Sequence, residues 1–400
     1  MSWQQRIQLA VQQRKEDNLW RQRINVASPQ GARIVVADQI LLNFSSNDYL
    51  GLAQQSESLA KAANTWGMGS GASHLVCGHS QAHQQLEQAL ALSVGYPRAL
   101  LFANGYMANL AVLQTLLKRQ DHLYQDKLNH ASLLDGGLIS GSKMRRYRHN
   151  DTEHLAYFLE QEQSPANLAT NNLSLVATDA VFSMDGDQAN LAGLADICQQ
   201  HEALLMVDDA HGFGVLGNNK YTGSIAHQGL SSDQVPIYMG TLGKGLGGYG
   251  AFVAGSEDLI EYLIQFARPY IYTTALPTAL ASAMQDNLAI IMSGERQKTL
   301  TSNIAYFRQQ AEQLALNIMP STTAIQPLMI ADDAKAVAIS QQLKQLGILV
   351  TAIRPPTVAK GSARLRITLT ASHTEQDIDQ LLTALVSLLT LNKVESNHGT

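Results

Sequence analysis

One lysine, Lys244, stands among five glycines in the segment TLGKGLGGYG, residues 241–250. Glycine lets the backbone and a bulky planar ligand approach one another closely, so a ligand could reach this lysine. Upstream, the apolar segment LLMV leads into Asp208 and Asp209, and His211 follows. Pyridoxal phosphate enzymes need a carboxylate beside the ring nitrogen and a lysine that carries the cofactor covalently. The order of these residues therefore indicates pyridoxal phosphate chemistry.

These residue patterns also allow other interpretations. The aspartate pair could cap a turn at the end of a strand. A D-D-x-H motif has too few ligands for a metal site on its own. GKGLGG and GLGGYG match the dinucleotide fingerprint literally, but the following YGAFVAG resembles a strand and not the required helix. His74, His79 and His83 lack cysteines or carboxylates at metal-binding spacing, so we interpret them as pocket wall and helix start, and we expect no metal.

The composition narrows the function classes. A chain of 400 residues with 45% hydrophobic and 15% charged residues is long enough for two or more domains. The net charge of −5 gives no general indication of nucleic-acid or membrane binding. The N-terminus lacks the apolar region of a signal peptide, and Cys77 and Cys198 form no disulfide framework. We therefore expect a cytoplasmic protein with two reduced cysteines.

The middle of the chain alternates strand-like and helix-like segments, which predicts an α/β fold with a mostly parallel sheet covered by helices. Polar groups at Asn104, 129–130, Ser183 and 208–211 follow predicted strands, and ligands bind at the carboxyl ends of such strands. The C-terminal quarter predicts a smaller α+β unit. The expected division is 1–45 for an N-terminal helix and short strands, 46–285 for a large cofactor-binding domain, 286–390 for the α+β domain, and 391–400 for a disordered tail.

In these residues the chain resembles the α-oxoamine synthases, which are fold-type I pyridoxal phosphate enzymes. Besides the aspartate, histidine and lysine motifs, five segments resemble the family and occur in its order. They are LNFSSNDYLGLA (42–53), GSGASHLVCGHSQAHQQLE (69–87), NGYMANLAVL (104–113), NHASLLDG (129–136) and VFSMDGDQANL (181–191). TAIRPPTVAKGSARLRITLTASHT (351–374) is similar to the branch that acts in biotin biosynthesis. Ala359, where proline is usual, and Tyr249 depart from the family pattern.

The resemblance implies roles for four catalytic residues. Lys244 would bind the cofactor and later move the α-proton of the amino acid, which requires a neutral amine. Asp208 would pair with the ring nitrogen, and His211 would hydrogen-bond the phenolic oxygen of the ring. His130 would lie over the face of the ring, where its second nitrogen can carry a proton.

The resemblance also implies binding residues. Backbone N–H groups of Gly105 and Tyr106, at a helix start, would hold the phosphate. Ser183 would contact the ring, and Thr241 would donate a hydroxyl to the phosphate. Substrate residues would be Asn47 and His130, with Arg354 on the amino acid carboxylate. Arg21 and Thr357 would meet the acyl group, although Arg23 is an alternative to Arg21.

The implied reaction is the decarboxylative condensation of L-alanine with pimeloyl-CoA, or with a pimeloyl carrier protein. The alternatives are a related synthase that uses glycine with acetyl-CoA or succinyl-CoA, and a non-catalytic homologue. The resemblance further implies a homodimer, with Thr241 and the segment GSGASHLVCGHS contributing across the subunit interface. No nucleic-acid or membrane partner is expected.

Overall fold

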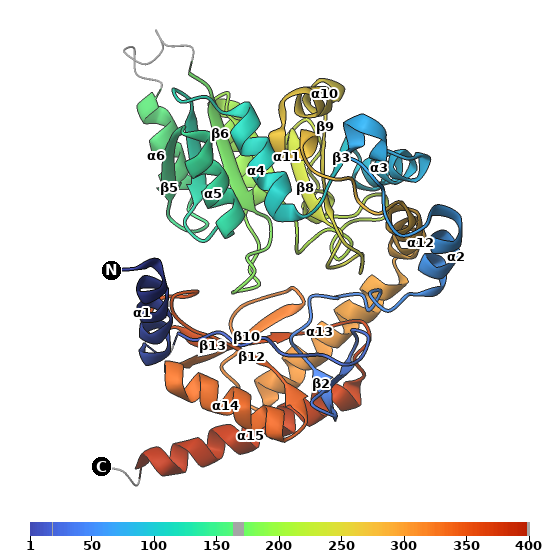
Figure 1. The fold of residues 1–400 in the computed structure, drawn as a ribbon. Coiled ribbons are helices and arrows are strands. Elements are labelled where there is room, and N and C mark those ends of the chain that lie inside the picture. The colour runs from blue at the N-terminus through green and yellow to red at the C-terminus, as the bar shows by residue number, and fades with distance from the viewer. Residues whose placement is uncertain (18, 163–171, 398–400) are drawn as a thin grey trace.

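The computed structural model describes residues 1–17, 19–162 and 172–397 (Figure 1). Its centre is a seven-stranded sheet with the strand order β3-β9-β8-β7-β6-β4-β5. Strands β4 to β8 run parallel, and β9 is antiparallel to both β8 and β3. The strands are β3 (Arg98–Phe102), β4 (His122–Asp126), β5 (Lys143–Tyr147), β6 (Ser174–Asp179), β7 (Leu204–Asp208), β8 (Ile237–Thr241) and β9 (Ala251–Gly255).

Helices cover both faces of this sheet, because alternate side chains of each strand point to opposite faces. In β7, Met206 packs with the helices of one face, while Leu205 and Val207 pack with those of the other. One face is covered by α4 (Gly105–Leu116), α5 (Ala131–Ser140), α10 (Glu257–Phe266) and α11 (Arg268–Ile271). The other is covered by α3 (Gln81–Val94), α6 (Thr152–Glu162), α8 (Leu191–Gln200) and α12 (Thr278–Ser293).

Two small sheets form the lower part of the molecule in Figure 1. One has the order β10-β13-β12 and is antiparallel; the other has the order β1-β2-β11. β2 and β11 pair in parallel, so the N-terminal strands join the C-terminal unit. The strands are β1 (Arg33–Val36), β2 (Gln39–Asn43), β10 (Ile325–Ala331), β11 (Ile348–Leu349), β12 (Thr351–Ile353) and β13 (Ala363–Thr368).

The remaining helices surround these sheets and connect the two parts. They are α1 (Trp3–Glu16), α2 (Glu57–Trp66), α9 (Ser224–His227), α13 (Glu295–Gln313), α14 (Asp333–Gln345) and α15 (Glu375–Asn397), with a π-helical turn η1 (His74–Gly78). None of the helices within the described residues is long and apolar enough to span a membrane.

The C-terminal end differs from the sequence-based expectation. We expected a disordered tail over 391–400, but α15 continues to Asn397, and residues 398–400 lie outside the described residues. The segment contains no glycine or proline before Gly399, so nothing in its backbone ends the helix at residue 390. The α/β fold with a mostly parallel, helix-covered sheet agrees with the prediction.

Candidate active site

The predicted site residues meet at the carboxyl ends of neighbouring strands. β7 ends at Asp208 and β8 ends at Thr241, and these two strands pair in parallel. β4 ends at Asp126, and His130 follows at the start of α5. Because these strands are parallel, their carboxyl ends lie on one edge of the sheet, which is where ligands bind in such folds.

The amine of Lys244 contacts His211, with 2.9 Å between Nζ and Nε2. The other ring nitrogen of His211, Nδ1, lies 2.6 Å from the hydroxyl of Tyr49, and this hydroxyl lies 3.3 Å from Oδ1 of Asn47. Burial lowers the pKa of His211 well below its ordinary value, and the nearby Lys244 lowers it further. The lysine amine is therefore held by a neutral imidazole.

The pKa of Lys244 is lowered to about 8. Burial disfavours the ammonium form, whereas the carboxylates of Asp208 and Asp179 favour it and partly offset this effect. The fraction of neutral amine at neutral pH is therefore larger than for an ordinary lysine, and the neutral amine is the form that attacks a carbonyl or accepts a proton.

Glycines around Lys244 allow close backbone packing. A Cβ on Gly245 would lie 2.5 Å from the carbonyl oxygen of Phe213, and a Cβ on Gly247, which has φ +70°, would lie 2.5 Å from the nitrogen of Ala53. These two glycines therefore allow other backbone segments of the protein to pack closely against the turn. They fix the turn that presents the lysine.

Asp208 is connected to His130 through two buried side chains that we did not identify in the sequence. Asn109 Nδ2 donates to Asp208 Oδ2 at 2.7 Å and to Ser132 Oγ at 2.8 Å. Ser132 Oγ lies 2.7 Å from Nδ1 of His130. Oδ1 of Asn109 is buried and has no hydrogen-bond partner. The amide of Asn109 thus directs an N–H donor at Asp208 and holds this carboxylate in place.

Asp209 points away from this group, as expected for neighbouring residues at a strand end. It accepts hydrogen bonds from the backbone N–H of Ser224 at 2.7 Å and from the hydroxyl of Tyr238 at 2.8 Å. The hydroxyl of Ser224 also donates to Asp209. Burial raises the pKa of Asp209 to about 6, and these hydrogen bonds partly counter the increase. Its contacts are those of a structural residue.

The start of α4 fits a phosphate group. Asn104 caps this helix by accepting from the N–H of Met107 at 2.9 Å, and Gly105 is its first residue. A Cβ on Gly105 would lie 2.7 Å from Cγ2 of Thr241, so only glycine leaves the helix end this close to β8. Free N–H groups at a helix N-terminus bind anions. The side chain of Tyr106 is exposed and donates to Asp135, so Tyr106 offers only its backbone N–H to a phosphate.

Arg366 is a buried cation that the sequence reasoning also missed. Its Nε donates to the carbonyl of Ser183 at 2.6 Å, and its Nη2 donates to Oδ1 of Asn47 at 3.2 Å. It is 7% exposed, and its charge lowers the pKa values of Lys244 and His211. The arginine is therefore near enough to the lysine for its charge to act on it. The spacing R-L-R in SARLRIT places both arginines on one face of a strand, and this pattern could have identified Arg366 as a candidate site residue.

The remaining predicted substrate residues lie apart from these contacts. Arg354 is half-buried and lines a cavity of about 820 Å³ together with Lys15 and Trp20. Arg21 and Arg23 are exposed. The exposed Thr357 lines a cavity of about 240 Å³ with Ser183, Ala359 and Arg364. Tyr249 is 51% exposed.

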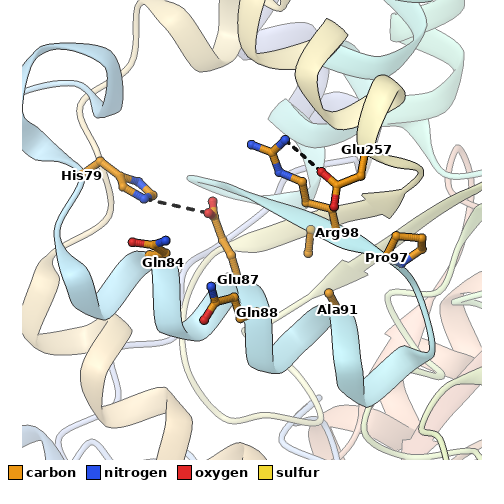
Figure 2. A pocket seen from close by; sticks show the side chains of 9 residues that line it. His79, Gln84, Glu87, Gln88, Ala91, Pro97, Arg98 and Glu257 are labelled. Atoms are coloured by element: carbon orange, nitrogen blue, oxygen red, sulfur yellow. Dashed lines mark hydrogen bonds and ion pairs between the residues drawn. The ribbon is translucent and has the colours of Figure 1, made fainter.

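The three histidines near residue 80 form a separate cluster. Nδ1 of His74 lies 2.9 Å from Nδ1 of His79, and His79 and His83 stack at 5.6 Å between ring centroids. His79 also lines the cavity of Figure 2, with Glu87 and Arg98. Within the described part of the chain, no three His, Cys, Asp or Glu side chains are arranged to hold a metal ion.

Comparisons with known proteins agree on one family. The family model for aminotransferase class I and II matches residues 39–385. A protein of Saccharophagus degradans named 8-amino-7-oxononanoate synthase is 52% identical over 395 residues, which are 97% of this chain and 98% of that protein. A protein of the same name from Pseudomonas fluorescens is 53% identical over 390 residues, 96% of this chain and 97% of that protein.

Solved structures of pyridoxal phosphate enzymes share the fold of this chain. A serine palmitoyltransferase from S. paucimobilis, solved with bound PLP, superposes with a TM-score of 0.90 at 26% identity, covering 98% of this chain and 100% of that chain. An 8-amino-7-oxononanoate synthase from Francisella tularensis superposes with a TM-score of 0.75 at 31% identity, covering 88% of this chain and 99% of that chain. The expected fold class, that of the pyridoxal phosphate enzymes of fold type I, is confirmed.

Proposed function

Because the chain belongs to the aminotransferase class I and II family, we propose that it condenses L-alanine with a pimeloyl thioester to 8-amino-7-oxononanoate, releasing carbon dioxide and the thiol, in biotin biosynthesis. It is a pyridoxal phosphate-dependent acyltransferase. The observation that carries the proposal is the partly buried contact between Lys244 and His211, with Asp208 near enough for its charge to act on the lysine. A binding protein without catalysis has no need for a lysine amine of lowered pKa.

The residues present fit the cofactor. Bound pyridoxal phosphate supplies a protonated pyridine ring that accepts the electrons of the alanine α-carbon when its proton leaves. Asp208 would pair with the ring nitrogen, and Asn109, which donates to Oδ2 of Asp208, holds the carboxylate in place for this role. The backbone N–H groups of Gly105 and Tyr106 at the start of α4, with the hydroxyl of Thr241, would hold the phosphate.

Lys244 accepts the α-proton of alanine as a neutral amine. His211 hydrogen-bonds the lysine and would hold the phenolic oxygen of the ring. His130 is exposed and would lie over the face of the ring. Its imidazole donates a hydrogen bond to the ketone oxygen as carbon dioxide leaves.

Substrate binding requires a cation for the alanine carboxylate. The sequence suggests Arg354, but the buried Arg366, which is hydrogen-bonded to Asn47 and Ser183, is the arginine whose charge acts on Lys244. We propose that Arg366 binds the carboxylate, with Asn47 orienting it. Arg354, Thr357 and Arg21 or Arg23 then face the acyl donor, which is pimeloyl-CoA or a pimeloyl carrier protein.

We propose a homodimer, supported by exposed apolar side chains in and beside the segment that was expected at the interface. Met68 is 96% exposed, Val76 77%, Leu75 51% and Tyr272 72%. A patch of this kind favours association with a second copy. A cytoplasmic location is supported by the free cysteines Cys77 and Cys198.

We also propose the three domain segments expected from the sequence for residues 1–390. All strands of the seven-stranded sheet fall within the proposed large domain, 46–285, and all strands of the β10-β13-β12 sheet fall within 286–390. The strands β1 and β2 of the N-terminal segment 1–45 pair with β11, so this segment packs on the C-terminal domain.

The test is product formation from L-alanine or glycine with pimeloyl-CoA, acetyl-CoA or succinyl-CoA. Alanine with pimeloyl-CoA should give the largest kcat/KM, and a preference for glycine with a shorter thioester would favour the alternative synthase. The Lys244→Ala variant should lose activity by about 10³-fold or more while remaining folded. Lys220→Ala, at an exposed turn, is the matched control. Borohydride should fix the cofactor on the wild type and on the control, but not on Lys244→Ala.

A further inference from the structure

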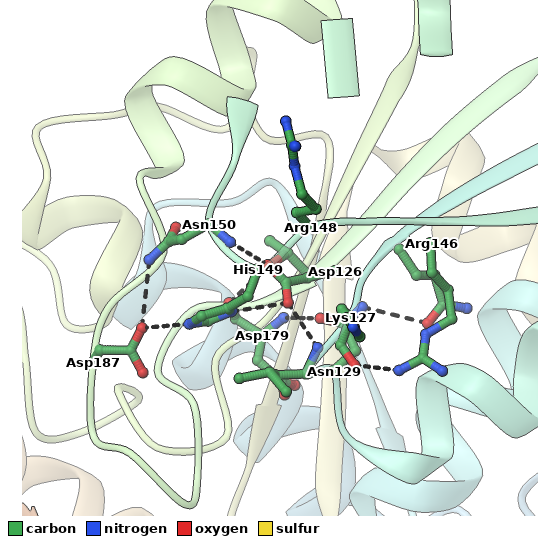
Figure 3. A network of polar contacts seen from close by, with 12 residues as sticks. Asp126, Lys127, Asn129, Arg146, Arg148, His149, Asn150, Asp179 and Asp187 are labelled. Carbon is green, nitrogen blue, oxygen red and sulfur yellow. Dashed lines mark hydrogen bonds and ion pairs between the residues drawn. The ribbon is translucent and has the colours of Figure 1, made fainter. Parts of the chain in front are cut away.

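His149 lies between two carboxylates at the edge of the site (Figure 3). Its Nδ1 is 3.0 Å from Oδ1 of Asp126, at the end of β4, and its Nε2 is 2.9 Å from Oδ2 of Asp187, in the loop after β6. A neutral imidazole has one N–H and would point a lone pair at one of these oxygens. Only the doubly protonated ring donates to both carboxylates. The geometry therefore selects the imidazolium.

The electrostatic surroundings agree with this geometry. Burial lowers the pKa of His149, but the hydrogen bonds and charges of Asp126 and Asp187 outweigh burial and raise the pKa to about 9. Of the two arginines in Figure 3, Arg148 pairs with Asp151 and Arg146 donates to the carbonyl of Lys127, so neither takes the place of His149 between the two carboxylates.

Asp126 organises the loop that leads to His130. Its Oδ1 also accepts from the N–H of Leu128 at 2.8 Å, and its carbonyl accepts from the N–H of Asn129 at 3.2 Å. Asn129 in turn donates from Nδ2 to the carbonyl of Ala177 at 2.8 Å. The next residue is His130. Any movement of the Asp126 carboxylate would thus shift the backbone that places His130.

Asp187 organises the opposite loop. Its carbonyl accepts from the N–H of Phe182 at 3.0 Å, and the ring of Phe182 packs edge-on against His149 with 4.4 Å between centroids. Ser183 follows, and its carbonyl accepts from Arg366 at 2.6 Å. Asn150, next to His149, donates from its backbone N–H to Asp126 at 2.8 Å and from its side chain to the carbonyl of Gln188 at 2.8 Å.

We propose that His149 is a positioning residue: its imidazolium joins the loop 126–130 to the loop 182–188 and so sets the distance between His130 and the Ser183–Arg366 pair. The role that we propose for His149 is indirect, because its ring nitrogens bond to Asp126 and Asp187. The proposal rests on the roles proposed above for His130 and Arg366. It deepens the proposed function by assigning the placement of these groups to an ion-paired histidine outside the site.

The test compares His149→Gln with His154→Gln in the cofactor-loaded protein. Glutamine keeps a donor but has no charge, and His154 is a nearby half-buried histidine that accepts from the N–H of Arg148 without bridging carboxylates. Nitrogen NMR of the wild-type histidines should show both ring nitrogens of His149 protonated at neutral pH, with a titration near pH 9. In His149→Gln, the His130 ring signals should shift and kcat should fall about tenfold, whereas His154→Gln should match the wild type.

A neutral His149 ring at neutral pH would overturn the proposal. So would a His149→Gln protein that melts at a lower temperature but keeps the wild-type His130 signals and kcat. Should His149→Gln not fold, Asp187→Asn removes one partner only, and it should lower the pKa of His149 and shift the His130 signals in the same direction. The NMR measurement needs no turnover, so it remains decisive if the condensation activity is absent.

Discussion

Nζ of Lys244 lies 2.9 Å from Nε2 of His211, and this pair connects the turn after β8 with the loop after β7. The ring of His211 is held on its other side by Tyr49, whose phenol is 1% exposed. The lysine amine is therefore held by His211 and His211 by Tyr49, and both of these groups are neutral.

The pH dependence of cofactor attachment should report the lowered pKa of Lys244. The rate at which pyridoxal phosphate binds covalently to the cofactor-free protein should rise with pH around a midpoint of about 8, because only the neutral amine reacts. Absorbance of the attached cofactor measures this rate. A midpoint near the ordinary lysine value of 10.5 would contradict the prediction.

The same shift predicts how stability changes with pH. Between pH 8 and 10.5 the unfolded chain binds more protons at this lysine than the folded chain does, so the free energy of unfolding should increase with pH through this window. Denaturant unfolding of the cofactor-free wild type and of Lys244→Met isolates the contribution. The increase should be absent in the methionine variant.

Asp208→Asn and Asp209→Asn should separate catalysis from stability. Asp208→Asn removes the charge beside the ring nitrogen, so exchange of the alanine α-proton for deuterium should slow by about 10²- to 10⁴-fold. Asp209→Asn disturbs the hydrogen bonds from Ser224 and Tyr238, so it should cost about 1–3 kcal/mol of stability and leave exchange within tenfold. NMR follows the exchange, and a larger loss of exchange at Asp209 would transfer the role to that residue.

Arg366→Lys and Arg354→Lys should identify the carboxylate-binding arginine. Lysine keeps the charge but lacks the planar fork, so Arg366→Lys should raise the KM for alanine about 10- to 100-fold with little change in the KM of the acyl thioester. Arg354→Lys should mainly raise the KM for the acyl thioester. The opposite pattern in steady-state kinetics would restore the sequence-based assignment to Arg354.

A charge among the exposed apolar side chains at Met68, Leu75 and Val76 should weaken the proposed dimer. Val76→Asp introduces a charge at a position that is 77% exposed in the single chain, so it should shift the protein toward monomers in sedimentation without unfolding it. Leu138→Asp, at a 66% exposed position on α5, is the matched control and should leave the sedimentation unchanged.

Hybrid dimers extend this test to the active site. Mixing Lys244→Ala with a variant in the segment 69–80 should restore part of the activity if each site is built from both chains. A fully active monomer at assay concentrations would rule out the shared site.

The sequence by itself determined the elements and the residues that lie close together along the chain. Alternating apolar segments indicated the helix-covered sheet, because the period of a strand and that of a helix are local properties. Asp208, His211 and Lys244 lie on two consecutive strand ends, so the order of the motifs was enough to group them. The helix start at Gly105 was visible for the same reason.

Tertiary structure alone decided which distant side chains complete the site. Asn109 and Asp208 are separated by 99 residues, Tyr49 and His211 by 162, and Asn47 and Arg366 by 319. The local periodicity of the sequence cannot predict such pairs. They form only when the strands assemble into the sheet and the C-terminal unit packs against it. A buried arginine and an exposed arginine look alike in a sequence, and burial is what separates Arg366 from Arg21 in the folded protein.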